Sequence, residues 1–82
     1  GFARHLEIGR AFMDLIFENG TLSCLMALTP AAFRHSWKFG LDLGFTRLGT
    51  IPGACGVLDR KTGVIRYRDG VLMKLDNPKP QP

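Results

Sequence analysis

The 82-residue sequence contains little of what would place it in several common protein classes. Its two cysteines, Cys24 and Cys55, are too few for a disulfide framework. Both lie in apolar segments, so we expect small buried side chains rather than redox centres or nucleophiles. Cysteine and histidine do not recur at the spacing of metal ligands, and no metal site is expected. No apolar run reaches the roughly 18 residues that a membrane-spanning helix needs.

Long runs of one charge are also missing. The formal net charge is +4 and the isoelectric point is about 9.6, which favours an anionic partner. This balance alone does not distinguish nucleic acid from a phosphorylated small molecule. The basic residues are dispersed, however, and the longest run of them is Arg60-Lys61. The absence of a basic stripe argues against a nucleic-acid module.

The first half of the sequence predicts a helix followed by a strand. Residues 6–18 carry apolar side chains at spacings of three and four, which indicates an amphipathic helix. These apolar residues are Ile8, Ala11, Phe12, Leu15 and Ile16. Gly20 suits the left-handed position past the last turn. Residues 21–28 are short and nearly all apolar, which is typical of a strand covered on both faces.

A second helix is predicted from Thr29-Pro30, with threonine as N-cap and proline in the first turn, to about Leu43. Its expected apolar stripe consists of Phe33, Trp37 and Leu41, and Gly44 is the expected C-cap. Gly40 weakens the helix interior by about 1 kcal/mol relative to alanine. Such a glycine often marks the close approach of another group.

The last part of the sequence has the pattern of a long β-hairpin. One strand is expected from Phe45 to Thr50 or beyond, with a bulge or bend at Pro52-Gly53. Residues 59–63 form the expected turn. Residues 64–75 form the last strand, for which an interruption at Asp69-Gly70 is left open. We therefore divide the chain into one domain, residues 1–75, and an extended proline-rich tail, residues 76–82.

The N-terminal segment resembles the pyrophosphate-binding loop of the GNAT (GCN5-related) N-acetyltransferase superfamily. The family pattern is Arg/Gln-x-x-Gly-x-Gly/Ala at a helix start, and here it reads Arg4-His5-Leu6-Glu7-Ile8-Gly9. Leu43-Gly44-Phe45 resembles the Gly-Phe pair that leads from a family helix into the next strand. The sequence pattern of residues 45–54 and 69–75 is similar to that of the family's final hairpin. Together these motifs imply an α/β fold, the C-terminal half of a GNAT domain in the order loop, helix, strand, helix, long hairpin.

The resemblance implies acetyl-CoA as cosubstrate and an amine as acceptor. A helix N-terminus offers free N–H groups and a partial positive charge to a pyrophosphate. The implied binding residues are Arg4, His5, Leu6, Glu7, Ile8, Gly9 and Arg10. Glu7 replaces the first glycine of the motif and puts a negative charge near the expected phosphates. The alternative is that Glu7 is simply a favourable acid in the first turn of an ordinary helix.

The catalytic residues usual in the family are absent from the second helix. Many members carry a tyrosine four residues before the glycine of the Gly-Phe pair, and this position is Gly40 here. The asparagine often found seven residues earlier corresponds to Phe33. Ser36 and His35 lie one turn away and are the candidates for proton donation. The alternative is that both are surface groups.

Three functions follow from the sequence. The leading one is an acetyl-CoA-dependent N-acetyltransferase. The main alternative is a non-catalytic binding or structural protein with the GNAT fold, because the altered motifs resemble phage-encoded members, some of them virion components. A small basic nucleic-acid module has only the net charge in its favour. The expected location is the cytoplasm, or the virion for a phage structural protein. We also expect the remainder of a GNAT domain, or another subunit, to cover the open edge of the apolar strand.

Overall fold

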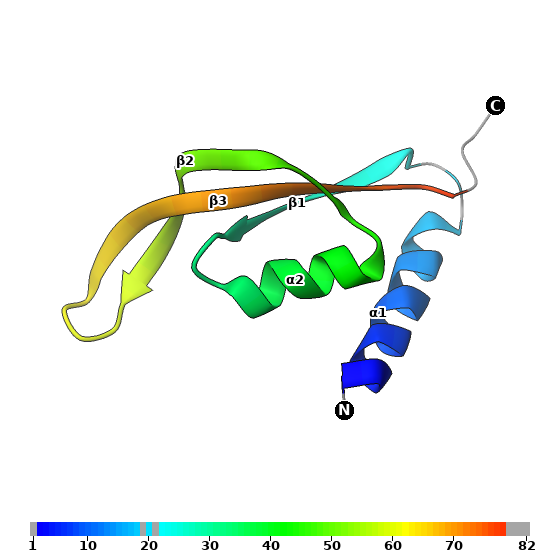
Figure 1. Ribbon diagram of the computed structural model, residues 1–82, viewed down its shortest axis with the longest axis horizontal. Helices are drawn as coiled ribbons and strands as arrows, with labels where there is room; N and C mark the ends of the chain where they lie inside the picture. Colours follow the sequence, from blue (N-terminus) through cyan, green and yellow to red (C-terminus); the bar gives the residue numbers. More distant parts are fainter. Residues whose placement is uncertain (1, 19, 21, 79–82) are drawn as a thin grey trace.

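The computed structural model describes residues 2–18, 20 and 22–78, which form two helices and three strands. The elements are α1 (Phe2–Phe17), β1 (Cys24–Pro30), α2 (Arg34–Leu43), β2 (Thr46–Asp59) and β3 (Val64–Asp76). The strands form one antiparallel sheet in the order β1-β3-β2, and both helices lie on the same side of it (Figure 1). The predicted α/β order of helix, strand, helix and hairpin is confirmed.

The predicted bulge lies in β2. The register of β2 against β3 shifts between Ile51 and Cys55, and Gly53 within this interval has a φ of 63°. Glycine adopts this left-handed conformation without the steric cost that a side chain would add. The Gly53 N–H donates to Oδ1 of Asp69 at 3.1 Å, so a carboxylate on β3 holds the bulge in place.

The predicted hairpin turn is also confirmed. Gly63 has a φ of 72°, and its N–H donates to the Asp59 carbonyl at 2.8 Å. The β3 strand runs through Asp69 and Gly70 without interruption and ends at Asp76. Asn77 is buried; its backbone N–H donates to Ser23 and its side-chain amide to Leu22. The first residues assigned to the tail are thus anchored, and Lys79–Pro82 lie outside the described residues.

The predicted start of the second helix was wrong. Thr29 and Pro30 belong to β1, where they pair with Val71 and Gly70. A proline is tolerated here because β1 lies at the edge of the sheet and Pro30 is its last residue. The Phe33 N–H then donates to the Pro30 carbonyl at 2.9 Å, which closes a turn before α2 begins. Phe33, expected in the apolar stripe, is instead the N-cap residue and half exposed.

The first helix begins at Phe2, four residues earlier than predicted. Its apolar residues do not form a single buried face. Ile8, Phe12 and Leu15 are all more than half exposed. The more buried residues of this helix are Leu6, Gly9, Met13, Ile16 and Phe17.

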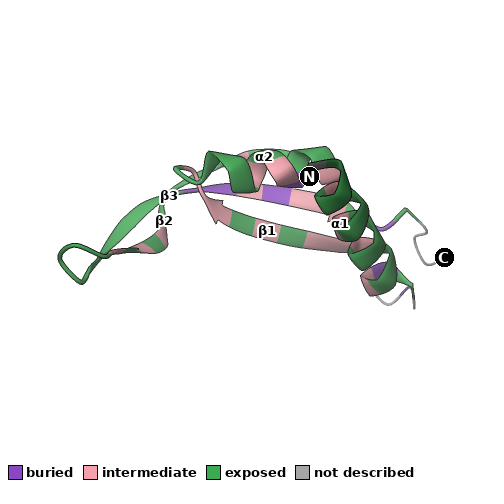
Figure 2. Cartoon of the chain, turned by 90° about the horizontal axis from the view of Figure 1, so that it is seen from below, coloured by how far each residue is buried: buried purple, intermediate pink, exposed green. Residues whose placement is uncertain are grey.

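The core lies where the centre of β3 faces the helices. Val71 and Met73 are almost fully buried, as is Phe17 at the end of α1. Figure 2 shows buried stretches of β3, whereas β1 is intermediate to exposed along its length. The expectation that β1 is covered on both faces is wrong for this chain, because Met26 and Leu28 are 61% and 46% exposed. With both helices on one side, the described residues provide no helix to cover the other face.

Candidate functional site

A hollow of about 400 Å³ lies between the first turns of the two helices. Its lining consists of His5 from α1 with His35, Ser36 and Phe39 from α2. Residues 35, 36 and 39 share one side of α2 because three or four residues make one helical turn. The structure therefore brings one residue of the predicted phosphate segment together with both predicted proton donors. Phe39 is the lining residue that sequence analysis missed, although its spacing from Ser36 indicated the same helix face.

The N-terminus of α1 is suited to an anion, because its first amides have no partner within the helix. Within an α-helix, each N–H from the fifth residue onward is bonded to the carbonyl four residues earlier. Because α1 begins at Phe2, the amides of residues 6–9 lie inside the helix, and the available donors are those of residues 2–5. The first turn carries no acidic residue. Arg4 and Glu7 are both exposed on this part of the helix.

Gly9 and Arg10 connect the two helices. A Cβ atom at position 9 would lie 2.7 Å from one methyl carbon of Leu43 and 3.5 Å from the ring of Phe39. Glycine at this position therefore allows α1 to approach α2 closely. The Arg10 guanidinium donates to the Asp42 carbonyl at 3.3 Å, near the C-terminal end of α2. The structure thus places Arg10 away from the hollow that His5 lines.

Gly40, which the resemblance places at the GNAT tyrosine position, faces the sheet. A Cβ atom there would lie 2.9 Å from Cε of Met73. The close approach predicted from this glycine is confirmed, and the neighbour is β3. Trp37 is half-buried; its indole N–H donates to the Ala31 carbonyl at 3.0 Å, and the Arg47 guanidinium lies 5.3 Å from its ring centroid. Trp37 thus joins α2 to the turn before it and to β2.

A larger hollow, of about 730 Å³, lies at the other end of α1. Its lining includes the carboxylates of Asp14 and Glu18, which would repel a phosphate. Nearby on β3, the Lys74 ammonium lies 3.1 Å from the Asp76 carboxylate. A side-chain hydrogen bond to Asp76, assisted by its charge, raises the pKa of Lys74 above the ordinary value of 10.5. For an anionic ligand, the smaller hollow with its two histidines is the better candidate.

In residues 2–18, 20 and 22–78, no three histidine, cysteine, aspartate or glutamate side chains are grouped as metal ligands. Neither described helix has the length and apolar character needed to cross a bilayer.

Comparison with solved structures finds the same fold in an acetyltransferase. The chain is similar to the ribosomal-protein-S5-alanine acetyltransferase from Vibrio fischeri, with a TM-score of 0.78 and 21% sequence identity. The likeness covers 100% of this chain and 42% of that protein, so this chain spans less than half the length of its structural neighbour. The sequence matches no protein-family model and no curated protein. The fold is therefore that of part of an acetyltransferase chain, and the predicted α/β fold is confirmed.

Proposed function

We propose that this chain forms the acetyl-CoA side of an N-acetyltransferase that transfers an acetyl group to an amine. The observation that carries the proposal is the shared hollow. It joins His5, from the segment assigned to phosphate binding, with His35 and Ser36, the residues assigned to proton transfer. These assignments came from separate parts of the sequence. Their convergence at one place in a fold shared with an acetyltransferase supports both.

In this proposal, the phosphates of acetyl-CoA lie at the N-terminus of α1. The free amides of residues 2–5 and the helix dipole favour an anion there. Arg4 and His5 stand within this first turn, where Arg4 adds a cationic donor and His5 adds a ring N–H. The amides of Leu6 and Ile8 are bonded within the helix and offer no donor to the phosphates, and Glu7 lowers the affinity for them through its charge. Arg10 acts indirectly, since its bond to α2 holds the two helices that flank the hollow.

The reaction needs few groups from this chain. The acceptor nitrogen attacks the thioester carbonyl, and the C–S bond breaks. The departing CoA thiolate takes up a proton and leaves as the thiol. His35 or Ser36 supplies that proton, because both line the hollow and both have an exchangeable hydrogen. Holding the two reactants in contact lowers the barrier further. The base that deprotonates the amine is assigned to the part of a GNAT domain that this chain does not span.

A second function, acetyl-CoA binding without catalysis, is favoured by the packing of Gly40. The usual tyrosine is absent, and its position is filled by contact with Met73. A protein of this kind would keep the fold and the anion site, as a structural component of a virion would. Binding and turnover measured on the same preparation distinguish the two functions.

Titration calorimetry with acetyl-CoA tests the proposal. We expect binding by the intact protein, and a loss of about tenfold or more in affinity when Arg4 and His5 are both changed to alanine. The matched control replaces Arg60 and Lys61 with alanine; these residues lie in the turn between β2 and β3, outside α1 and α2. Absence of binding, or an equal loss in both double variants, would contradict the proposed site.

A further inference from the structure

The β2–β3 hairpin extends beyond the end of β1, so part of β3 has a neighbouring strand on one side only (Figure 1). The last pair between β1 and β3 is Pro30 with Gly70, whereas β2 remains paired with β3 as far as Val64. We call residues 64–69 of β3, on the side away from β2, the free edge. At its inner end the Asp69 carbonyl accepts a hydrogen bond from the Ala31 N–H at 2.8 Å.

The bond to Ala31 fixes which main-chain groups point toward the free edge. Successive residues of a strand direct their N–H and C=O groups to opposite sides. The main-chain carbonyl of Asp69 points away from β2, toward Ala31. The N–H and C=O groups of Tyr67 and Ile65, two and four residues earlier, therefore also point away from β2. The N–H and C=O groups of Arg66 and Arg68 point toward β2. The free edge thus presents two N–H and two C=O groups in line with β1, at a place that β1 does not reach.

Apolar side chains lie beside these groups. Tyr67 is 74% exposed, and Ile65 and Leu58 are each 57% exposed. A Cβ atom at Gly56 would lie 3.2 Å from Cγ2 of Ile65 and 3.6 Å from Cε1 of Tyr67, so these side chains share one face of the hairpin. The small glycine leaves that face shallow and open. An added strand would place every second side chain against this apolar surface.

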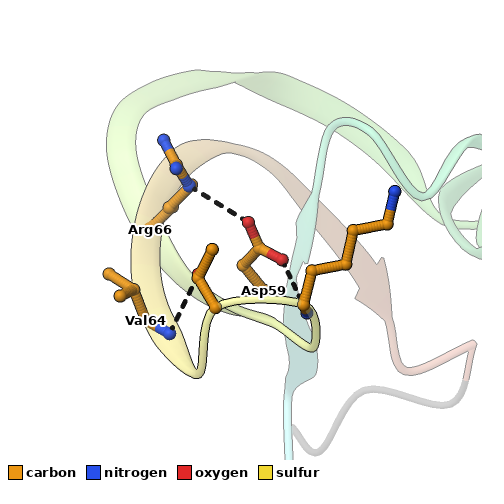
Figure 3. Close-up of polar contacts among 5 residues, drawn as sticks. Asp59, Val64 and Arg66 are labelled. Carbon is orange, nitrogen blue, oxygen red and sulfur yellow. Dashed lines mark hydrogen bonds and ion pairs between the residues drawn. The ribbon is translucent and has the colours of Figure 1, made fainter.

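The charge of the hairpin indicates the kind of strand. The Asp59 carboxylate is already engaged: it lies 3.5 Å from Nε of Arg66 and accepts a bond from the Lys61 N–H at 2.9 Å (Figure 3). The Asp69 carboxylate likewise accepts a bond from the bulge at Gly53. Between residues 55 and 69, the part of the hairpin that carries the free edge, the remaining charged side chains are basic, and they are Arg60, Lys61 and Arg68. The surroundings of the free edge are therefore positive.

We propose that the free edge binds an extended segment of another protein, rich in acidic residues with apolar side chains at alternate positions, by strand addition to β3. Main-chain hydrogen bonds to Ile65 and Tyr67 would supply affinity, and the apolar face and basic surroundings would supply selectivity. A second copy of this chain is a poorer occupant, because pairing two free edges would place two positively charged hairpins side by side. The proposal is independent of acetyl transfer.

Backbone amide exchange measured by NMR tests the pairing directly. The probe is a capped peptide of about seven residues that alternates glutamate and valine. Its control has the same sequence with N-methyl groups on alternate amides, which prevents one edge of the peptide from pairing. We expect the first peptide to slow exchange at Ile65 and Tyr67 by about tenfold or more, with little change at Arg66 and Arg68. The methylated peptide should leave all four unchanged.

Two variants supply the protein-side control. Tyr67→Pro removes an N–H of the free edge without removing a bond to β2, and we expect it to weaken peptide binding by about tenfold. Tyr67→Phe keeps that N–H and should bind within about twofold of the original chain. Equal binding of both peptides, or no binding, would overturn the proposal. So would slow exchange at Ile65 and Tyr67 before peptide is added, together with a dimer in sedimentation, because a second copy would then occupy the edge. The exchange measurement stands even if Tyr67→Pro fails to fold.

Discussion

Gly40 of α2 lies against Met73 of β3, and a Cβ atom at position 40 would come within 2.9 Å of the Met73 Cε. Met73 is 2% exposed, so its side chain has little space into which it can move. A tyrosine at position 40 cannot be accommodated without separating α2 from the sheet. We predict that Gly40→Tyr lowers the free energy of unfolding by about 3 kcal/mol, as measured by urea denaturation, and adds no acetyltransferase activity.

Gly40→Ala is the matched control for that prediction. It gains about 1 kcal/mol of helix propensity, which offsets the displacement of the end of the Met73 side chain. We expect a net change within about 1 kcal/mol of zero. A tyrosine variant as stable as the alanine variant would show that position 40 does not face the core.

The contact between Gly9 and Leu43 predicts coupling between two substitutions. Gly9→Ala places a methyl group where a methyl carbon of Leu43 now lies, 2.7 Å from the ideal Cβ. In a Leu43→Ala background that conflict is removed, and the same alanine should then be favourable for helix stability. A double-mutant cycle by urea denaturation should give a coupling of about 1 kcal/mol. Additive effects would mean that α1 does not pack on α2 at this point.

Glu7 affords a test of the proposed phosphate site. We expect Glu7→Gln to tighten acetyl-CoA binding by about threefold, because it removes a negative charge near the N-terminus of α1 while keeping a good helix former. Glu7→Gly should tighten binding less, since glycine weakens the helix by about 1 kcal/mol. Glu18→Gln, at the other end of α1, is the control and should leave the affinity unchanged. If Glu7→Gln has no effect or weakens binding, the phosphates lie elsewhere.

Acetyl transfer by the intact protein should be slow, since Gly40 provides no acid for the leaving thiolate. If His35 or Ser36 supplies the proton, changing both to alanine should lower kcat by about 100-fold. Lys38→Ala, an exposed change on the same helix, is the control and should leave the rate unchanged. A fast rate that is indifferent to the double substitution would place the acid outside this half of the domain.

The Lys74–Asp76 pair predicts a small alkaline effect. Because the folded state raises the pKa of Lys74, the pair contributes stability below the ordinary pKa of 10.5 and loses it as the pH rises through the raised value. We expect Asp76→Ala to bring the pKa of Lys74 back toward its ordinary value, as followed by NMR of the side chain. An unchanged pKa would show that the pair does not form in solution.

Local chemistry determined those features that a few neighbouring residues decide. The glycines at positions 44, 53 and 63 were expected at a helix end, a bulge and a hairpin turn, and each has a positive φ there. These predictions hold because only glycine adopts such backbone angles at little cost. The order of helices and strands was likewise predicted from the spacing of apolar residues along the chain, which differs between helices and strands. The resemblance of short motifs then identified the fold, which the structural comparison supports.

Only the tertiary structure decided where each element begins and what its side chains contact. Thr29-Pro30 has the composition of a helix start, but pairing with Val71 and Gly70 keeps both residues in β1. The hydrophobic pattern of α1 does not show that Gly9 packs on α2, nor that Ile8 remains exposed. His5 and His35 line the same hollow only because α1 and α2 pack together, although the two residues are 30 positions apart in the sequence. Such long-range contacts are set by the balance of packing over the whole chain, which no local pattern encodes.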